Sequence, residues 1–131
     1  MSRIGLVTVV VREYDEAIRF YVDALGFDLL EDSPVSGSKR WVVVGPAGGG
    51  TALLLARAGT DEQRARIGAQ TGGRVAFFLD TEDFAAARHR LSDAGARFVE
   101  EPRQEAYGTV AVFEDLYGNR WDLVERAPGG P

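Results

Sequence analysis

The sequence contains no cysteine, one histidine and one methionine, and its only lysine is Lys39. The absence of cysteine excludes disulfides, thiol nucleophiles and thiolate metal sites. Long hydrophobic runs are also missing: Arg12 and Glu13 interrupt the apolar start of the chain, too early for a signal peptide or a membrane span. We therefore expect a cytoplasmic protein without a membrane partner.

Basic residues are outnumbered, because 15 Lys and Arg oppose 20 Asp and Glu and give a net charge of −5. Such a surface repels phosphates, and no run of Lys or Arg offsets it, so no nucleic-acid partner is expected. What is present suits a folded core. The 131 residues, 45% of them hydrophobic, are enough for one domain.

The single histidine offers no catalytic group. His89 lies about 140° around a predicted helix from the apolar Phe84, so it faces away from the core and is expected on the surface. No serine therefore has a histidine base, which excludes triad chemistry.

The chain reads as an internal repeat. A shift of 68 residues pairs Gly5 with Gly73, and a shift of 69 pairs Gly26 with Gly95. Each copy has the same order of predicted elements, βαβββ. We expect a single domain, 1–131, with a first module at about 3–57, a linker at 58–72 and a second module at about 73–126.

The elements of each module follow from local patterns. In the first module we expect a helix at 14–25 and strands at 4–11, 27–31, 39–44 and 51–57. In the second module we expect a helix at 84–94 and strands at 74–79, 97–101, 109–113 and 120–125. Thr81 is the expected cap of the second helix, and Thr60 with Gln63 predicts a short capped helix in the linker.

One helix covers only one face of the sheet in each module. The two uncovered faces are expected to form a trough that holds side chains, a ligand or a partner. Open sheet edges favour a homodimer.

The two modules, with FYVDALGF at 20–27 and FEDLYGNRWDL at 113–123, resemble the vicinal oxygen chelate superfamily. It includes glyoxalase I, bleomycin-resistance proteins, extradiol dioxygenases and fosfomycin-resistance proteins. The resemblance covers the chain from about Ile4 to Glu125. It implies an α+β fold in which two βαβββ modules form a curved eight-stranded mixed sheet.

Metal-dependent members of that superfamily take His or Glu ligands from the first and last strands of each module. The matching positions are Leu6, Arg74, Leu53 (or Leu54, if the register shifts by one) and Asp122. Leucine has no donor atom and arginine repels a cation, so only Asp122 is competent. The resemblance therefore implies a site without a metal cofactor.

Arg74 and Asp122 are the first candidates for a binding site. Their ion pair either replaces the metal and leaves a guanidinium for an anionic or carbonyl group, or is a purely structural pair. Other candidates share the trough face or lie near strand ends, where aromatic rings stack on flat ligands. They are Thr8, Val10, Arg40, Trp41, Leu53, Ala76, Phe78, Tyr107 and Trp121.

The favoured interpretation is a metal-free, homodimeric protein that binds a small hydrophobic or aromatic molecule, as drug-sequestering members do. The alternative is an enzyme of the same superfamily, a glyoxalase-like lyase or isomerase or a dioxygenase. Such an enzyme would use a metal or Asp122 as general base. A third possibility is an interaction domain whose trough is filled by its own side chains.

Overall fold

The computed structural model describes residues 1–128 and divides into two compact units. The first unit is Met1–Ile67 and the second starts at Gly68, so the boundary falls inside the predicted linker. The first unit has the predicted βαβββ order, and the second has the same order with one further strand, which confirms the α+β fold class and supports the repeat.

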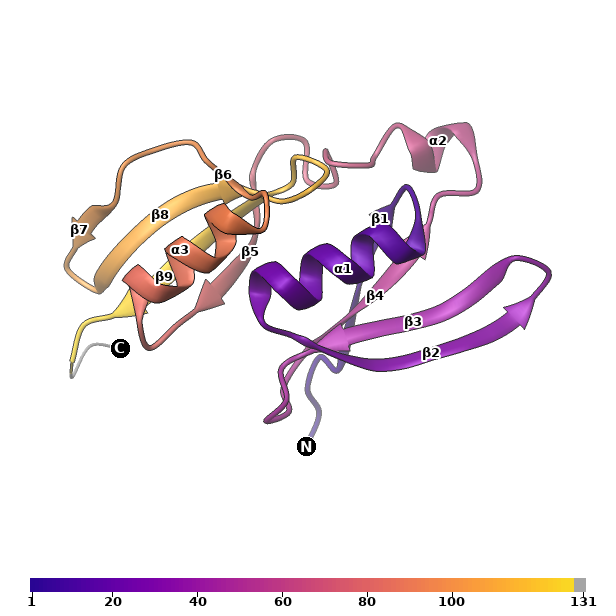
Figure 1. Ribbon diagram of the computed structural model, residues 1–131, viewed down its shortest axis with the longest axis horizontal. Helices are drawn as coiled ribbons and strands as arrows, with labels where there is room; N and C mark the ends of the chain where they lie inside the picture. Colours follow the sequence, from indigo (N-terminus) through magenta and orange to yellow (C-terminus); the bar gives the residue numbers. More distant parts are fainter. Residues whose placement is uncertain (129–131) are drawn as a thin grey trace. The chain divides into compact units, whose positions relative to one another are not determined.

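The first unit is a four-stranded sheet with the strand order β1-β4-β3-β2 and the helix α1 on one face (Figure 1). Its first strand runs parallel to its last, and the other neighbours are antiparallel. The elements are β1 Leu6–Val11, α1 Tyr14–Leu25, β2 Asp28–Ser36, β3 Lys39–Gly45 and β4 Ala52–Arg57.

The core of this unit lies between α1 and the sheet. Val9 and Val11 of β1 are fully buried on the helix side, while Val10 between them points to the other face. The helix contributes Tyr14, Ala17 and Tyr21 from one stripe. It ends at Gly26, whose φ of 72° lies in the left-handed region that glycine tolerates best.

The linker holds the predicted short helix, α2 Asp61–Arg64. The Thr60 hydroxyl accepts a hydrogen bond from the Gln63 N–H at 3.1 Å, as a capping box requires. The Gln63 side chain reaches one residue further back than expected and accepts from the Gly59 N–H at 2.7 Å.

The second unit repeats this topology with the strand order β5-β9-β8-β6, and a further strand, β7, also pairs with β8. Figure 1 shows α3 lying along this sheet. The elements are β5 Val75–Asp80, α3 Phe84–Asp93, β6 Arg97–Phe98, β7 Arg103–Glu105, β8 Gly108–Glu114 and β9 Arg120–Arg126. The helix cap is Asp83 and not Thr81, because the Asp83 carboxylate accepts the Ala86 N–H at 3.1 Å.

The strand predicted at 97–101 is shortened to β6, and β7 follows after Pro102 as an additional strand, so the described residues form nine strands where eight were expected. Pro102 has no N–H for a ladder, which favours a break at this point. The Glu100 carboxylate fills the gap by accepting the Val112 N–H at 2.9 Å. Arg103 in turn donates to Glu100 at 3.1 Å.

The turn between β8 and β9 is organised by a buried carboxylate. Asp115 accepts hydrogen bonds from the backbone N–H groups of Tyr117, Gly118 and Asn119 at 3.0–3.1 Å. Its second oxygen accepts from the Asn119 amide at 3.2 Å and from the Trp121 indole at 3.0 Å. One side chain therefore fixes both the turn and the first core residue of β9.

No helix within residues 1–128 is long and apolar enough to cross a membrane.

We predict that Asp115→Ala lowers the free energy of unfolding by about 3–5 kcal/mol, because it leaves several buried donors without an acceptor. Urea unfolding followed by circular dichroism measures the loss. Asp93→Ala is the control, since that aspartate is exposed on α3, and it is expected to change stability by less than about 0.5 kcal/mol. Equal effects of the two variants would contradict this role.

Candidate functional site

The face of the first sheet that α1 leaves uncovered carries several of the predicted site residues. Parallel register pairs place Thr8 beside Leu54 and Val10 beside Ala56 on this open face. Leu53 pairs with Val7 and is buried on the helix side. The prediction of Leu53 as a site residue is therefore wrong by one register step, and Leu54 takes its place.

A pocket opens where β3 and β4 separate. The two strands pair only at Val43–Leu54 and Val44–Leu53, although both continue beyond these residues. The resulting cavity has a volume of about 440 Å³. It is lined by Thr8, Tyr14, Lys39, Arg40, Trp41, Leu54, Leu55, Ala56, Arg57, Ala58 and Gly59.

Trp41 gives this pocket an aromatic wall. It lies two residues from Val43, the partner of Leu54, and so belongs to the open face. Its side chain remains 38% exposed, whereas Val42 beside it in the sequence is fully buried. An exposed indole beside Leu54 and Ala56 offers a flat apolar surface for stacking.

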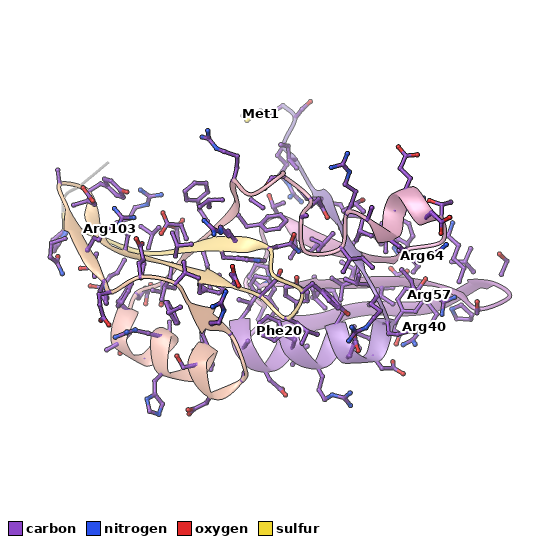
Figure 2. The ribbon with its side chains drawn as sticks, turned by 90° about the horizontal axis from the view of Figure 1, so that it is seen from above. Met1, Phe20, Arg40, Arg57, Arg64 and Arg103 are labelled. Carbon is purple, nitrogen blue, oxygen red and sulfur yellow. The ribbon has the colours of Figure 1, made fainter. Side chains whose placement is uncertain are left out.

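The other wall is built on Tyr14, at the start of α1. The Tyr14 hydroxyl accepts the Arg40 backbone N–H at 3.1 Å, where a ladder bond to β4 is lacking. The guanidinium groups of Arg40 and Arg57 lie 5.0 and 5.1 Å from the centre of the Tyr14 ring. Figure 2 shows both arginines at the same end of the first unit.

Arg40 lines the pocket, but its charge is already compensated. Its guanidinium lies 2.7 Å from Asp32 and 3.0 Å from Asp15. The hydrogen bond from Arg40 holds the pKa of the Asp32 carboxyl below its usual value, and the bonds to Asp32 and Asp15 raise the pKa of Arg40. Arg40 therefore forms part of the pocket wall, and its positive charge is already paired and not available to a ligand.

The open face of the second sheet brings Phe78 and Asp122 together. They are partners in the parallel pairing of β5 and β9, and Val112 flanks Asp122 on β8. The Phe78 ring is 65% exposed, while Asp122 is only 7% exposed. The Asp122 Oδ1 atom is buried without a hydrogen-bond partner among the described residues.

Burial raises the pKa of the Asp122 carboxyl above its usual value. The charge of Arg103 acts in the opposite direction, and Glu100 adds to the increase. Asp122 is thus a poorly solvated acid without a direct cationic partner.

The predicted ion pair between Arg74 and Asp122 is not formed. Arg74 precedes β5 and is exposed, and within residues 1–128 its side chain pairs with no carboxylate. A bulge between Val75 and Phe77 interrupts the alternation that was expected to align Arg74 with the strand face. Ala76 lies at this bulge and is half-buried.

The two remaining aromatic candidates differ from each other. Trp121 is a core residue: it is 3% exposed, on the helix side of the sheet, between Phe77 and Phe113 at ring distances of 4.6 and 5.9 Å. Its prediction as a ligand-stacking residue is wrong, because its ring is buried in the core, where its indole N–H also donates to Asp115. Tyr107 is exposed before β8, outside the pocket at Trp41.

The positions that hold a divalent cation in metal-dependent relatives do not fit one here. Leu6 and Leu54 have no donor atom, the exposed Arg74 carries positive charge, and Asp122 supplies a single carboxylate. Residues 1–128 contain no group of three or more His, Asp or Glu side chains arranged to hold a metal.

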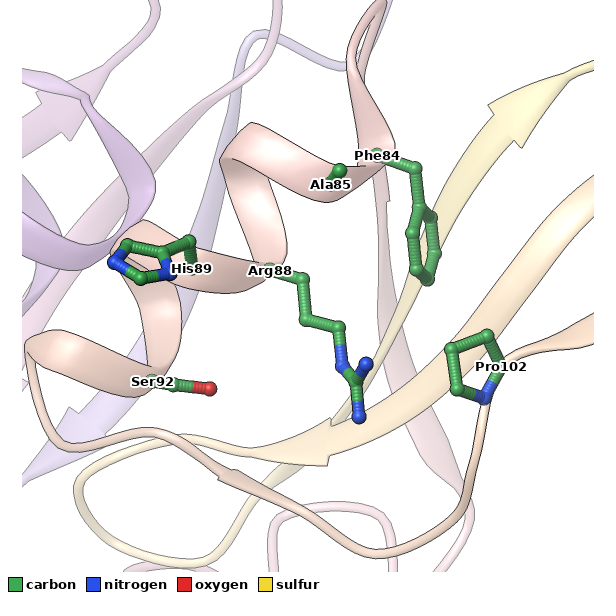
Figure 3. A pocket seen from close by; sticks show the side chains of 6 residues that line it. All are labelled: Phe84, Ala85, Arg88, His89, Ser92 and Pro102. Atoms are coloured by element: carbon green, nitrogen blue, oxygen red, sulfur yellow. The ribbon is translucent and has the colours of Figure 1, made fainter.

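A second pocket, of about 330 Å³, lies between α3 and Pro102, which stands between β6 and β7 (Figure 3). In Figure 3, Phe84, Arg88 and Pro102 face one another across it. His89 lies at its rim, exposed and paired with Asp93 at 3.2 Å. This confirms the prediction of a surface histidine, and this pocket contains none of the predicted ligand-binding residues.

Sequence reasoning missed Tyr14 and Arg57 as pocket residues. Tyr14 begins the helix predicted at 14–25, and its ring is buried against the sheet, but nothing in the helical pattern indicates that its hydroxyl replaces a ladder acceptor. The separation of β3 from β4 has no signature in either strand's sequence.

The sequence profile of the Glyoxalase/Bleomycin resistance protein/Dioxygenase superfamily matches residues 3–123 of this chain. An uncharacterized protein of Shewanella frigidimarina (strain NCIMB 400) is 54% identical over 121 residues, which cover 91% of this chain and 90% of that protein.

Two solved structures are similar over nearly the whole chain. The crystal structure of UcmS2 has a TM-score of 0.80 at 32% identity and covers 95% of this chain and 98% of that one. TnmS3, an antibiotic binding protein from Streptomyces sp. CB03234, has a TM-score of 0.77 at 31% identity, and the match covers 97% and 98%.

We predict that Asp122→Leu raises the free energy of unfolding at neutral pH by about 1–3 kcal/mol, because it removes an unsatisfied buried carboxylate. A raised pKa in the folded state means that the ionised carboxyl disfavours folding. The penalty is full above the raised pKa and shrinks as the pH falls toward the usual value for aspartate. Urea unfolding of both proteins between pH 7 and about pH 4 measures this difference. A loss of stability in Asp122→Leu at pH 7 would contradict the prediction.

Proposed function

Because the chain belongs to the glyoxalase/bleomycin resistance protein/dioxygenase superfamily, we propose that it binds and sequesters a small aromatic molecule. The antibiotic binding of TnmS3, which resembles this chain over almost its full length, supports a ligand of antibiotic type. Binding, and not conversion of the ligand, is the function of the site.

The observation that carries this proposal is the pocket between β3 and β4. Its volume of about 440 Å³ lies in the range that encloses small ligands. Its lining joins the exposed indole of Trp41 to the apolar Leu54 and Ala56. Pockets of this composition bind flat, largely apolar compounds, while a few polar groups orient them.

The charges around the pocket fit such a ligand. Arg40 is neutralised by Asp15 and Asp32, and Arg57 is bonded to the Ser38 hydroxyl at 2.5 Å with Glu13 at 3.8 Å. The two guanidinium groups therefore stiffen the pocket wall next to Tyr14. Because their charges are already paired, they do not require an anionic ligand. The protein acts without a metal, as a cytoplasmic homodimer.

We predict that Trp41→Ala weakens binding of an aromatic antibiotic by at least about tenfold, since it removes the stacking surface. Trp41→Phe retains most of the affinity. Because Trp121 is buried in the core, quenching of indole emission in wild type reports ligand at Trp41, and isothermal titration calorimetry measures the affinity of each variant.

The matched control is Leu29→Ala, which removes another exposed apolar side chain of the same sheet outside the pocket. It is expected to leave the affinity unchanged. An equal loss in both variants, or none in Trp41→Ala, would remove the basis of the proposed site.

Metal analysis tests the metal-free proposal. Protein expressed with added Ni, Zn, Fe and Mn salts is expected to contain substoichiometric metal after gel filtration, because a single carboxylate does not retain such ions. Chelator treatment is expected to leave the melting temperature and the ligand affinity unchanged. Stoichiometric metal, or loss of binding after chelation, would favour an enzyme of the superfamily instead.

A further inference from the structure

The charged side chains that line the pocket of the first unit are all basic. Among the described residues, the lining includes Lys39, Arg40 and Arg57 and no aspartate or glutamate. The composition of the chain does not favour such a lining, because 20 acidic residues outnumber 15 basic ones. The sign of the charge at the pocket therefore favours an anionic ligand over a cationic one.

Lys39, the only lysine of the chain, differs from the two arginines in having no partner. Both guanidinium groups are engaged by carboxylates that lie outside the lining. The Lys39 ammonium, in contrast, forms no ion pair and no hydrogen bond within residues 1–128, and its side chain is exposed. A carboxylate on a ligand can pair with Lys39 without displacing an internal partner.

The backbone on both sides of Lys39 is held in place. The Arg57 guanidinium donates to the Ser38 hydroxyl at 2.5 Å and to the Ser38 carbonyl at 3.4 Å. On the other side, the Arg40 backbone N–H donates to the Tyr14 hydroxyl at 3.1 Å. The first residue of β3 therefore has a defined position at the pocket although its ammonium is free, and less of the chain has to be ordered when a ligand binds.

Lys39 and Trp41 lie on the same face of β3. The register shift in the hairpin of β2 and β3 falls at Val35 on β2, so β3 continues without a bulge from Lys39 to Trp41. Residues spaced by two are about 7 Å apart along a strand and point the same way. A lysine side chain spans most of this distance. An acidic group at the edge of a ring stacked on Trp41 is therefore within reach of the ammonium.

We propose that the pocket selects aromatic ligands that carry an acidic group, and that Lys39 determines this specificity by pairing with the acid. This inference rests on the proposed function, because the ring of the ligand has to occupy the pocket at Trp41. The ammonium donates charged hydrogen bonds to the carboxylate at the exposed end of the pocket. Because the pair is exposed, salt screens it and its strength decreases as the ionic strength rises.

The experiment uses three probes of the same shape and different charge: anionic 2-naphthoate, neutral 2-naphthamide and cationic 2-naphthamidinium. Isothermal titration calorimetry with the intact protein compares their affinities at low salt. Wild type is expected to bind 2-naphthoate at least about fivefold more tightly than 2-naphthamide, as an exposed charged hydrogen bond provides. 2-Naphthamidinium is expected to bind more weakly than 2-naphthamide. The preference for 2-naphthoate is expected to shrink in about 0.5 M NaCl.

Lys39→Met, which keeps an unbranched apolar side chain, is expected to abolish the preference and to leave the affinity for 2-naphthamide within about twofold. Lys39→Arg keeps the positive charge and most of the preference, and Lys39→Glu reverses it in favour of 2-naphthamidinium. Arg19→Met is the matched control, because Arg19 is an exposed cation of α1 outside the pocket lining. Its loss tests the general field of the unit, and this control keeps the full preference.

Equal binding of 2-naphthoate and 2-naphthamide by wild type would overturn the role of Lys39 and leave the proposed function intact. The same conclusion follows if Lys39→Met keeps the preference, or if Arg19→Met loses it to the same extent. Failure of wild type to bind any of the three probes would instead contradict the proposed function itself, and this inference with it.

Discussion

The structure of each unit depends on one constraint: a single helix covers one face of a sheet, of four strands in the first unit and five in the second, and does not cover the other face. The first strand pairs in parallel with the last, which places the connecting helix on one side only. Val9, Val11, Leu53 and Leu55 fill the covered side of the first sheet. Val10 and Leu54, which lie between these residues in the sequence, point to the opposite face. A ligand can bind only on that face, because the helix occupies the first one.

The two units use this bare face differently, although their topology is the same. In the second unit β8 and β9 are paired from Gly108–Arg126 to Glu114–Arg120, so these two strands leave no gap between them. In the first unit β3 and β4 pair at two positions and then separate, and the gap becomes a pocket with Tyr14 in its wall. Duplication thus supplied two scaffolds, of which one is open between strands and the other carries an acid on a continuous surface.

The sequence predicted the repeat, the α+β class and most elements, because strand alternation, helical spacing and glycines such as Gly26 are local signals. For the same reason it predicted Phe78 on an open face and Trp41 near a strand end. It failed where long-range register decides: Leu53 is one step off, Trp121 lies on the covered side, and the bulge at Ala76 separates Arg74 from Asp122. The bonds of Asp115 and the gap beside β3 depend on how strands meet, which no single segment encodes.

The break between β6 and β7 has a consequence for the behaviour of the protein at high concentration. A straight outer strand presents a row of free backbone groups on which other chains can assemble. Here the edge strand is interrupted at Pro102, and the Val112 N–H of β8 donates to the Glu100 side chain instead of to a backbone carbonyl. Arg103 adds a charge beside this carboxylate. An edge strand that is interrupted, charged and short of N–H groups is a poor template for fibril growth. The interruption that shortens the strand therefore also disfavours self-association of the chain as amyloid.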